Sequence, residues 1–415
     1  MEGTKLSDFL LSILTLCLYA FLSIVALAKL DVTLCLLLIM ELQKNALMAL
    51  DTIHQKPTKG IPSWLIHPME HRIIDRLAGV PEGTYKTDPE TTYVRMQRNI
   101  GTCMLDQFIP KNPLKMGDHG FDDGTQKSAT TGVNEIVLDG IVINSPEAVV
   151  EHMEKFVFPP LREEITAFDA ETYARQFIDK KRTVQETLGP DILHASCDGA
   201  GHPYLFYFSY GYAYYFMAYA LYPELMEKHF SLQADLIVMK NRVLAKVFRE
   251  EHLPPMMRIG QDLADSRGTL VDPTSLDEIW FPHFTRSVKP LVDAGIRLIW
   301  HCDGNLMQMV PRLLEAGLYG FQGFQYEDGM DYEKICRMKT KNGDGLLIIG
   351  GVSVTRTLPF GTPEDVRKEM TWLVEKGPKT GLFLGGSSSI APGVSWGNIK
   401  TLVEGLRYYR EKGRN

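Results

Sequence analysis

The chain has 415 residues, of which 45% are hydrophobic and 23% charged, and its formal net charge is −7. This length allows a large buried core and is compatible with an α/β barrel that contains insertions. The acidic balance gives no electrostatic basis for a nucleic-acid partner. The six cysteines contain no CxxC pair, which is typical of free thiols in a reducing compartment, so a cytoplasmic location is expected.

The first segment of the chain, residues 1–39, is apolar. FLLSILTLCLYAFLSIVALA (9–28) is uncharged and about long enough to cross a bilayer. The apolar core is too long for a signal peptide, and no convincing small-residue cleavage site follows it. Two interpretations remain open. The segment is either a membrane anchor, with membrane contact through residues 6–39, or a spurious extension before a true start at Met40.

Residues 40–415 are predicted to form one folded domain. An amphipathic helix is predicted from Glu41, and strands are predicted at 61–67 and 103–109. The segment 135–144 alternates around Asp-Gly, which predicts a hairpin. Ser145 is then expected to cap a helix, because proline follows it at the first helical position.

Downstream, apolar segments alternate regularly with helical patterns. The predicted strands are Ile192–Cys197, Met256–Ile259, Leu298–Trp300, Gly320–Phe324, Leu346–Ile349 and Leu382–Leu384. The helical patterns include Met307–Ala316, Pro363–Lys376 and Gly397–Glu411. Alternation of this kind predicts parallel strands covered by helices. With about eight strand candidates, a (β/α)8 TIM-type barrel is favoured over an open sheet.

Polar residues follow several of these strands. They are Asp198, Asp262, His301, Asp303, Gln325, Glu327 and the run Ser387–Ser389. The carboxyl ends of barrel strands meet at one mouth, so Asp262, His301 and Glu327 are expected to share a pocket. The alternative for any one of these acids is an ordinary turn or N-cap role.

The run RLIWHCDGN (297–305) is the most informative of these strand ends. Residues at i and i+2 of a strand point to the same side, so His301 and Asp303 can converge while Cys302 points away and packs. The aromatic stretch 204–222 is expected to be mainly core, with Tyr207, Tyr210 or Tyr212 as the residue that lines the site.

Several motifs in the same order resemble the uroporphyrinogen decarboxylase superfamily. They are Gly260-Gln261-Asp262-Leu263, Arg267-Gly268, Pro282, Lys289-Pro290, His301-Cys302-Asp303-Gly304-Asn305, Gly329-Met330-Asp331, Gly350-Gly351-Val352, Gly361 to Val366, and Ser387 to Asn398. The resemblance extends from about residue 40 to the end and is densest after Met256. It implies a TIM-type barrel with the site at the C-terminal mouth. It does not account for residues 1–39, which favours the spurious-start interpretation.

Within this superfamily, the chain is more similar to the methyltransferase branch than to the decarboxylases. The decarboxylases have an arginine-rich motif resembling RQAGRY, whereas residues 64–70 here contain no arginine before Arg72. A polyanionic tetrapyrrole requires several cationic partners, so decarboxylation is the second interpretation. The methyltransferase branch implies transfer of a methyl group to or from a corrinoid (cobalamin) cofactor on a separate partner protein.

The zinc-dependent thiol methyltransferases of that branch use a His-x-Cys pair and a distant cysteine. His301 matches the histidine, Asp303 stands at the first cysteine position, and Ser388 is nearest to the distant one. The thiolate site is therefore lost. Because zinc also accepts nitrogen and carboxylate ligands, a set of His301, Asp303 and Glu327 remains a hypothesis for a metal site.

The replacement of cysteine by aspartate resembles the O-demethylase-type members. These take a methyl group from a methoxylated aromatic or another small methylated donor. Cleavage of an ether is helped by a Lewis acid or a general acid, roles assigned here to His301, Asp303 and Glu327, while Asp262 orients substrate or ligand. Asp198, Gln325, Tyr207 and Ser388 are predicted to bind substrate. A non-catalytic barrel that binds a small ligand or a corrinoid protein is the third interpretation.

Overall fold

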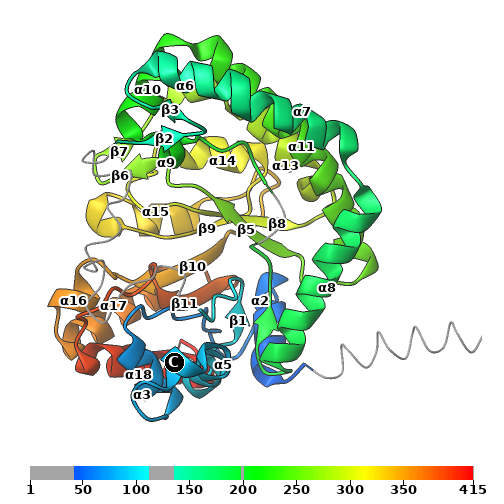
Figure 1. Ribbon diagram of the computed structural model, residues 1–415. Helices are drawn as coiled ribbons and strands as arrows, with labels where there is room; N and C mark the ends of the chain where they lie inside the picture. Colours follow the sequence, from blue (N-terminus) through cyan, green and yellow to red (C-terminus); the bar gives the residue numbers. More distant parts are fainter. Residues whose placement is uncertain (1–41, 112–134, 198–200, 415) are drawn as a thin grey trace, which may run out of the picture. The chain divides into compact units, whose positions relative to one another are not determined.

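The computed structural model describes residues 42–111, 135–197 and 201–414 (Figure 1). These belong almost wholly to one compact unit, residues 45–415. The apolar segment 1–39 lies outside the described residues, so both interpretations of it stay predictions. None of the described helices is long and apolar enough to cross a membrane.

A five-stranded parallel sheet forms the centre of the unit. It contains β5 (Met256–Gly260), β8 (Arg297–His301), β9 (Gly320–Gln322), β10 (Leu347–Val352) and β11 (Leu382–Gly386). The strand order is β11-β10-β9-β8-β5, and every neighbouring pair is parallel. The middle residues of all five strands are buried, as expected for parallel strands covered on both faces. The predicted α/β class is thereby confirmed.

The remaining predicted strands are much shorter than expected. β1 (Met104–Leu105) pairs in parallel with β4 (Leu193–His194), and both have only two residues. The segment predicted at 61–67 forms no regular strand; parallel bridges join Ser63 to Leu384 and Trp64 to Met104. Proline at positions 62 and 68 lacks the N–H that a ladder needs, which explains the interruption. The regular strands of the described part therefore do not close into the predicted eight-stranded barrel.

Two short antiparallel hairpins extend from this framework. The predicted hairpin is present as β2 (Val137–Leu138) and β3 (Ile141–Val142), and its central residues Asp139 and Gly140 both have positive φ, 48° and 82°. This combination suits a two-residue turn. The second hairpin, β6 (Ala264–Asp265) and β7 (Gly268–Thr269), begins directly after the Asp262 region.

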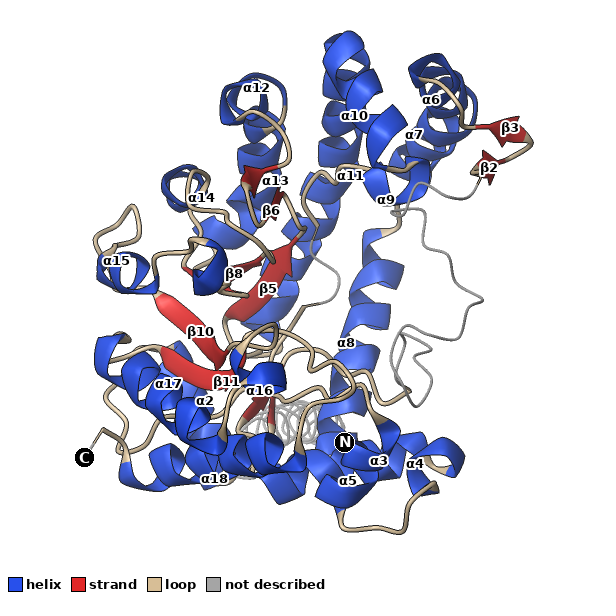
Figure 2. Cartoon of the chain, turned by 90° about the vertical axis from the view of Figure 1, so that its left-hand side faces the viewer, coloured by secondary structure: helices blue, strands red, loops and turns tan. Residues whose placement is uncertain are grey.

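Helices surround the strands and fill the connections between them (Figure 2). They are α2 (Lys44–Ile53), α3 (His71–Ala78), α4 (Thr84–Thr87), α5 (Pro89–Ile100), α6 (Pro146–His152), α7 (Phe158–Ala167), α8 (Ala170–Leu188), α9 (Tyr207–Tyr210), α10 (Tyr212–Leu221), α11 (Pro223–Glu250), α12 (Pro273–Ile279), α13 (Phe281–Asp293), α14 (Val310–Ala316), α15 (Tyr332–Arg337), α16 (Thr357–Phe360), α17 (Pro363–Lys376) and α18 (Trp396–Lys412). Long α11 packs on α13, α7 and α8, while α17 and α18 cover β10 and β11. The predicted cap of α6 is confirmed, because the Ser145 side chain accepts from the Ala148 N–H.

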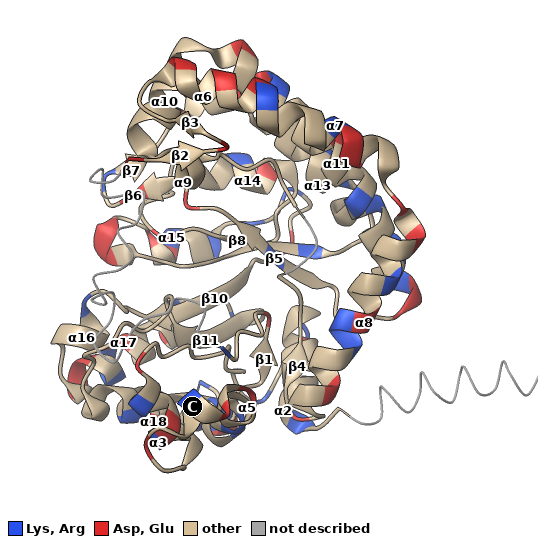
Figure 3. Cartoon of the chain, viewed as in Figure 1, with Lys and Arg blue, Asp and Glu red and all other residues tan. Residues whose placement is uncertain are grey.

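The aromatic stretch 204–222 contributes several residues to the core, as the sequence favoured, although Tyr204, Phe208 and Leu221 are exposed. Tyr207, Tyr210 and Tyr215 are each no more than 1% exposed. The outer helices carry the charges, and acidic and basic residues are mixed along α7 and α8 (Figure 3). Apolar packing therefore holds the helices against the strands, while the mixed charges face outward.

Candidate functional site

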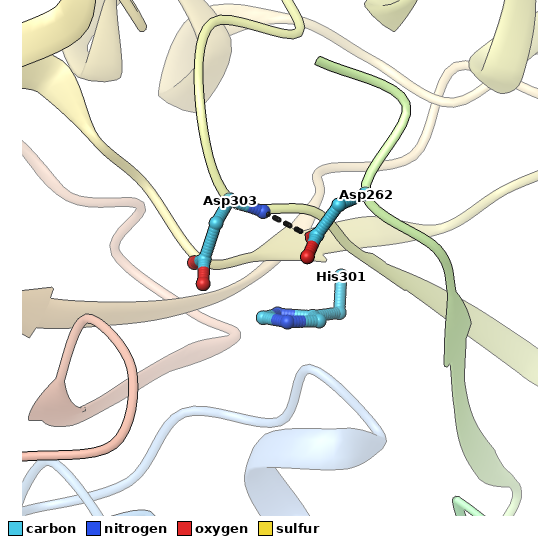
Figure 4. Close-up of side chains that lie close together, drawn as sticks. All are labelled: Asp262, His301 and Asp303. Atoms are coloured by element: carbon cyan, nitrogen blue, oxygen red, sulfur yellow. Dashed lines mark hydrogen bonds between the residues drawn. The ribbon is translucent and has the colours of Figure 1, made fainter. Parts of the chain in front are cut away.

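Three titratable side chains meet at the carboxyl ends of two adjacent strands. Asp262, His301 and Asp303 each place a potential ligand atom within 4.8 Å of the others (Figure 4). His301 is the last residue of β8 and is paired in register with Gly260, the last residue of β5. Asp262 and Asp303 are each two residues beyond that pair. The Asp303 N–H donates to the Asp262 carboxylate at 2.8 Å, which fixes the two strand ends together.

Glycine allows the neighbouring backbones to come close to His301. Gly260 has φ +148°, and a Cβ there would lie 2.1 Å from the His301 carbonyl oxygen. Gly323 has φ +85°, and a Cβ there would lie 2.9 Å from His301 Nδ1. A side chain at either position would strain the backbone, and it would clash with the His301 main chain at Gly260 and with the imidazole at Gly323. These two glycines therefore set the position of the ring.

Burial shifts all three pKa values toward the neutral forms. The pKa of His301 is lowered to about 4, first by burial and then by the charge of Arg258, with Asp262 acting in the opposite direction. The pKa of Asp303 is raised to about 6 by burial, against the Ser388 hydrogen bond. Burial also raises the pKa of Asp262, although His301 opposes the shift. At neutral pH the imidazole is therefore uncharged, the form that binds a metal ion.

Two atoms in this group are buried and have no hydrogen-bond partner among the described residues. They are His301 Nδ1 and Asp303 Oδ1. An unsatisfied buried polar atom costs about 1–3 kcal/mol, so both are suited to a ligand. Imidazole nitrogen and carboxylate oxygen are ligands that zinc accepts, and three protein ligands leave a coordination position open. The residues present therefore fit a divalent cation.

The predicted third ligand, Glu327, is not part of this group, which is a correction. It lies in the 3-10 turn Tyr326–Asp328, five residues beyond Gln322, the partner of His301 in β9. Its Oε1 accepts hydrogen bonds from Ser353 at 2.5 Å and from Thr355. Asp262 lies only two residues beyond Gly260, the residue of β5 that pairs with His301, so Asp262 reaches the imidazole instead. Glu327 is still near enough for its charge to raise the pKa of Asp303.

The predicted substrate-binding residues mostly support the backbone around the group. Ser388 Oγ donates to Asp303 Oδ2 at 3.3 Å, and Gln325 Oε1 accepts from the Gly304 N–H at 2.5 Å. Tyr207 has no exposed surface, and its hydroxyl donates to the Asp262 carbonyl at 2.5 Å. Tyr207 therefore fixes the main chain at Asp262 through this hydrogen bond. Asp198 lies outside the described residues.

Cys302 points away from the group, as its position in the strand predicted. It is 2% exposed, and its sulfur accepts from the Leu263 N–H at 3.3 Å. Burial raises the pKa of its thiol, so the nucleophilic thiolate is disfavoured. Cys302 therefore packs between β5 and β8 and takes no part in the ligand set.

Beneath the group lies a buried ion pair that sequence reasoning missed. Arg258 Nε donates to Asp106 Oδ2 at 2.5 Å, with the two side chains 7% and 0% exposed. Trp64 Nε1 donates to the other carboxylate oxygen at 3.0 Å. The available signal was the single charge inside the apolar run of β5, Met-Met-Arg-Ile-Gly. A charge in a buried strand requires a partner, although the sequence does not say which one.

Ser353, just after β10, connects the site to a second buried acid. Its N–H donates to Glu369 of α17 at 2.6 Å, while its hydroxyl donates to Glu327. Burial raises the pKa of Glu369 to about 7, with the Ser353 hydrogen bond acting against the shift. In the folded protein, Glu369 therefore stays protonated up to about pH 7. In the unfolded chain, the same carboxyl group loses its proton near its ordinary pKa of 4.5.

We expect Glu369→Gln to become progressively more stable than the original protein as pH rises from about 4.5 to about 7. The folded state binds more protons than the unfolded state in this window, so the stability of the original protein falls with rising pH. Glutamine keeps the acceptor for Ser353 but cannot ionise. The difference in unfolding free energy should reach on the order of 2–3 kcal/mol above neutral pH. Melting temperatures of both proteins at pH 4.5 and 8 test this; a pH-independent difference would contradict it.

Comparisons with known proteins bear on the fold. No family model matches the chain, and no curated protein matches it. Among solved structures, the chain is similar to a methyltransferase from Methanosarcina mazei, with a TM-score of 0.50 and 14% sequence identity. The match covers 88% of this chain and 98% of that chain. The likeness therefore extends over nearly the whole α/β arrangement described above.

Proposed function

We propose that this protein is a methyltransferase that takes a methyl group from a small methylated donor, such as a methoxylated aromatic, and passes it to a corrinoid on a partner protein. The observation that carries the proposal is the Asp262, His301 and Asp303 group at the ends of β5 and β8. The similarity of fold to a methyltransferase and the superfamily-like motifs of the sequence support it.

We further propose that the strands belong to an eight-membered barrel of the uroporphyrinogen decarboxylase-like kind. Single parallel bridges support this, because Ser196 pairs with Met257 of β5, and Ser63 and Trp64 pair with β11 and β1. Together with the regular pairings, these bridges give each of eight parallel segments two neighbours. The ligand site of such a barrel is expected at the C-terminal ends of its strands.

The chemistry of ether cleavage explains the need for this group. The C–O bond breaks, the methyl group goes to the corrinoid, and the alkoxide that leaves must gain a proton or a counter-charge. A divalent cation bound by His301, Asp303 and Asp262 would supply Lewis acidity at the ether oxygen. In the alternative without a cation, the protonated form of Asp303, held in place by Ser388 and Asp262, would deliver the proton to that oxygen, and burial raises the pKa of Asp303 to about 6.

The ion pair in the interior disfavours the decarboxylase alternative. Arg258 of β5 is close enough for its charge to lower the pKa of His301, and it is paired with Asp106. Recognition of a tetrapyrrole with several carboxylates requires several cations that are not already neutralised. A small donor with a single ether or hydroxyl oxygen suits the group better.

The decisive experiment is an anaerobic methyl-transfer assay with the full chain. A reduced corrinoid is mixed with methoxylated aromatics and other small methylated donors, with and without added Zn²⁺, and its methylation is followed by visible absorption. We expect at least one donor to methylate the corrinoid, and faster when the metal is present. Binding of Co²⁺, followed by its own absorption, tests the metal site separately. If His301→Ala binds Co²⁺ as tightly as the original protein, the proposed metal site is wrong.

A further inference from the structure

We propose that a second site, at the opposite ends of the strands from the Asp262 group, binds a small phosphate-bearing anion. A pocket of about 220 Å³ lies where β11 begins and where the segment leading to Ser63 enters the strands. Its lining residues are Thr52, Thr58, Lys59, Gly60, Ile61, Lys379, Thr380, Gly381, Leu382, Lys412, Gly413 and Arg414. We call it the basic pocket.

The first argument is charge. Four of the lining residues are lysine or arginine and none is acidic, although the chain as a whole has a net charge of −7. Within the described part of the chain, Lys59, Lys379 and Lys412 form no ion pair. Some exposed lysines elsewhere are paired, such as Lys56 with Asp51 at 3.2 Å and Lys400 with Glu404 at 3.7 Å. Among the described residues, the basic pocket therefore gathers basic residues with no acidic residue in its lining.

The second, independent argument is a buried hydroxyl. Thr52 of α2 lines the basic pocket and is 2% exposed, and its Oγ1 has no hydrogen-bond partner among the described residues. Leaving a buried hydroxyl unsatisfied destabilises a fold, so such a group is normally paired. An anion oxygen in the basic pocket would accept this hydrogen bond.

The walls of the basic pocket are built from backbones in close contact. Gly413 has φ +73°, and a Cβ there would lie 2.3 Å from the Lys59 carbonyl oxygen. A Cβ at Gly60 would lie 1.8 Å from the Arg410 carbonyl oxygen. Arg414 donates to the carbonyl oxygens of Val374 and Pro378, which fixes the end of the chain beside the turn before β11. The three lysines are thus brought together on fixed backbone.

These features favour a phosphate group over other anions. Lysine binds phosphate as a point charge, and hydroxyl groups complete the coordination of the oxygens. The volume is below the roughly 300 Å³ at which pockets for drug-sized ligands begin, so a nucleoside does not fit in full. Inorganic phosphate, pyrophosphate or a short phosphomonoester fits the size and the charge.

Isothermal titration of the full chain with phosphate, pyrophosphate and glycerol phosphate tests the proposal, with ionic strength held constant by chloride. We expect saturable binding and a loss of affinity of roughly tenfold or more in the double variant Lys379→Ala/Lys412→Ala. The double variant Lys289→Ala/Lys400→Ala removes the same charge elsewhere and is expected to bind as the original protein does. Tightest binding of phosphate or pyrophosphate would indicate a free ion as the ligand, whereas tightest binding of glycerol phosphate would indicate a phosphorylated metabolite.

Thr52→Val probes the hydroxyl without changing charge or shape, and we expect it to weaken binding by several-fold. His301→Ala is expected to leave phosphate binding unchanged, so the result stands apart from the proposed methyl transfer. The proposal is overturned if the original protein shows no saturable binding, or if the Lys379/Lys412 variant binds all three anions with unchanged affinity.

Discussion

His301→Ala is expected to lower the rate of methyl transfer by roughly a hundred- to a thousandfold, the usual effect of removing one group that stabilises developing charge. The imidazole is neutral at pH 7 because burial and Arg258 lower its pKa to about 4, and its Nδ1 is buried without a partner. It is therefore placed to bind a cation and not to carry a charge itself. Asp303→Asn should cause a loss of similar size. The measurement is the initial rate of corrinoid methylation, together with the metal content of each purified variant.

Two control variants separate a local effect from a general one. His252→Ala removes an exposed histidine after α11, and Asp293→Asn removes an exposed carboxylate that pairs with Lys289 on α13. Both should retain full activity. If His301→Ala and Asp303→Asn also keep near-original rates and metal content, the Asp262 group is not the reaction centre, and the non-catalytic interpretation gains support.

The parallel strands and most covering helices could be predicted from the sequence, because buried parallel strands are continuous apolar runs. The segment predicted at 298–300 is the centre of β8, and that predicted at 382–384 is the first part of β11. The predicted eight-stranded barrel is not formed by the regular strands of the described part; only bridges of one residue link the segment near Pro62 to its neighbours, and no local pattern there distinguishes a strand from an extended loop.

The site was predicted in part for a similar reason. Alternation along a strand correctly separated His301 and Asp303 from Cys302. The choice between Asp262 and Glu327 depended on register between strands, because only the pairing of Gly260 with His301 brings Asp262 to the imidazole. Register is set by tertiary packing, and a single sequence does not reveal it.

The ion pair beneath the site leads to the largest expected effect on stability. Asp106→Asn is expected to lower the free energy of unfolding by about 3–5 kcal/mol, because it removes the carboxylate charge that pairs with the buried Arg258 guanidinium. Asp106 is completely buried, accepts from both Arg258 and Trp64, and is 152 residues from Arg258 in the chain. Urea unfolding followed by tryptophan fluorescence measures the change.

A surface pair and a double variant identify the cause of that loss. Asp277→Asn breaks the exposed pair with Arg312 and should change the stability by less than about 1 kcal/mol. Asp106→Leu/Arg258→Met removes both charges at once and should recover most of the stability lost by Asp106→Asn, because an apolar pair leaves no charge to desolvate. If the double variant is less stable than Asp106→Asn, the hydrogen bonds to Asp106 matter more than charge balance. Arg258 would then be retained in the interior for the hydrogen bond that it donates to Asp106, and its lowering of the His301 pKa would be a by-product of that role.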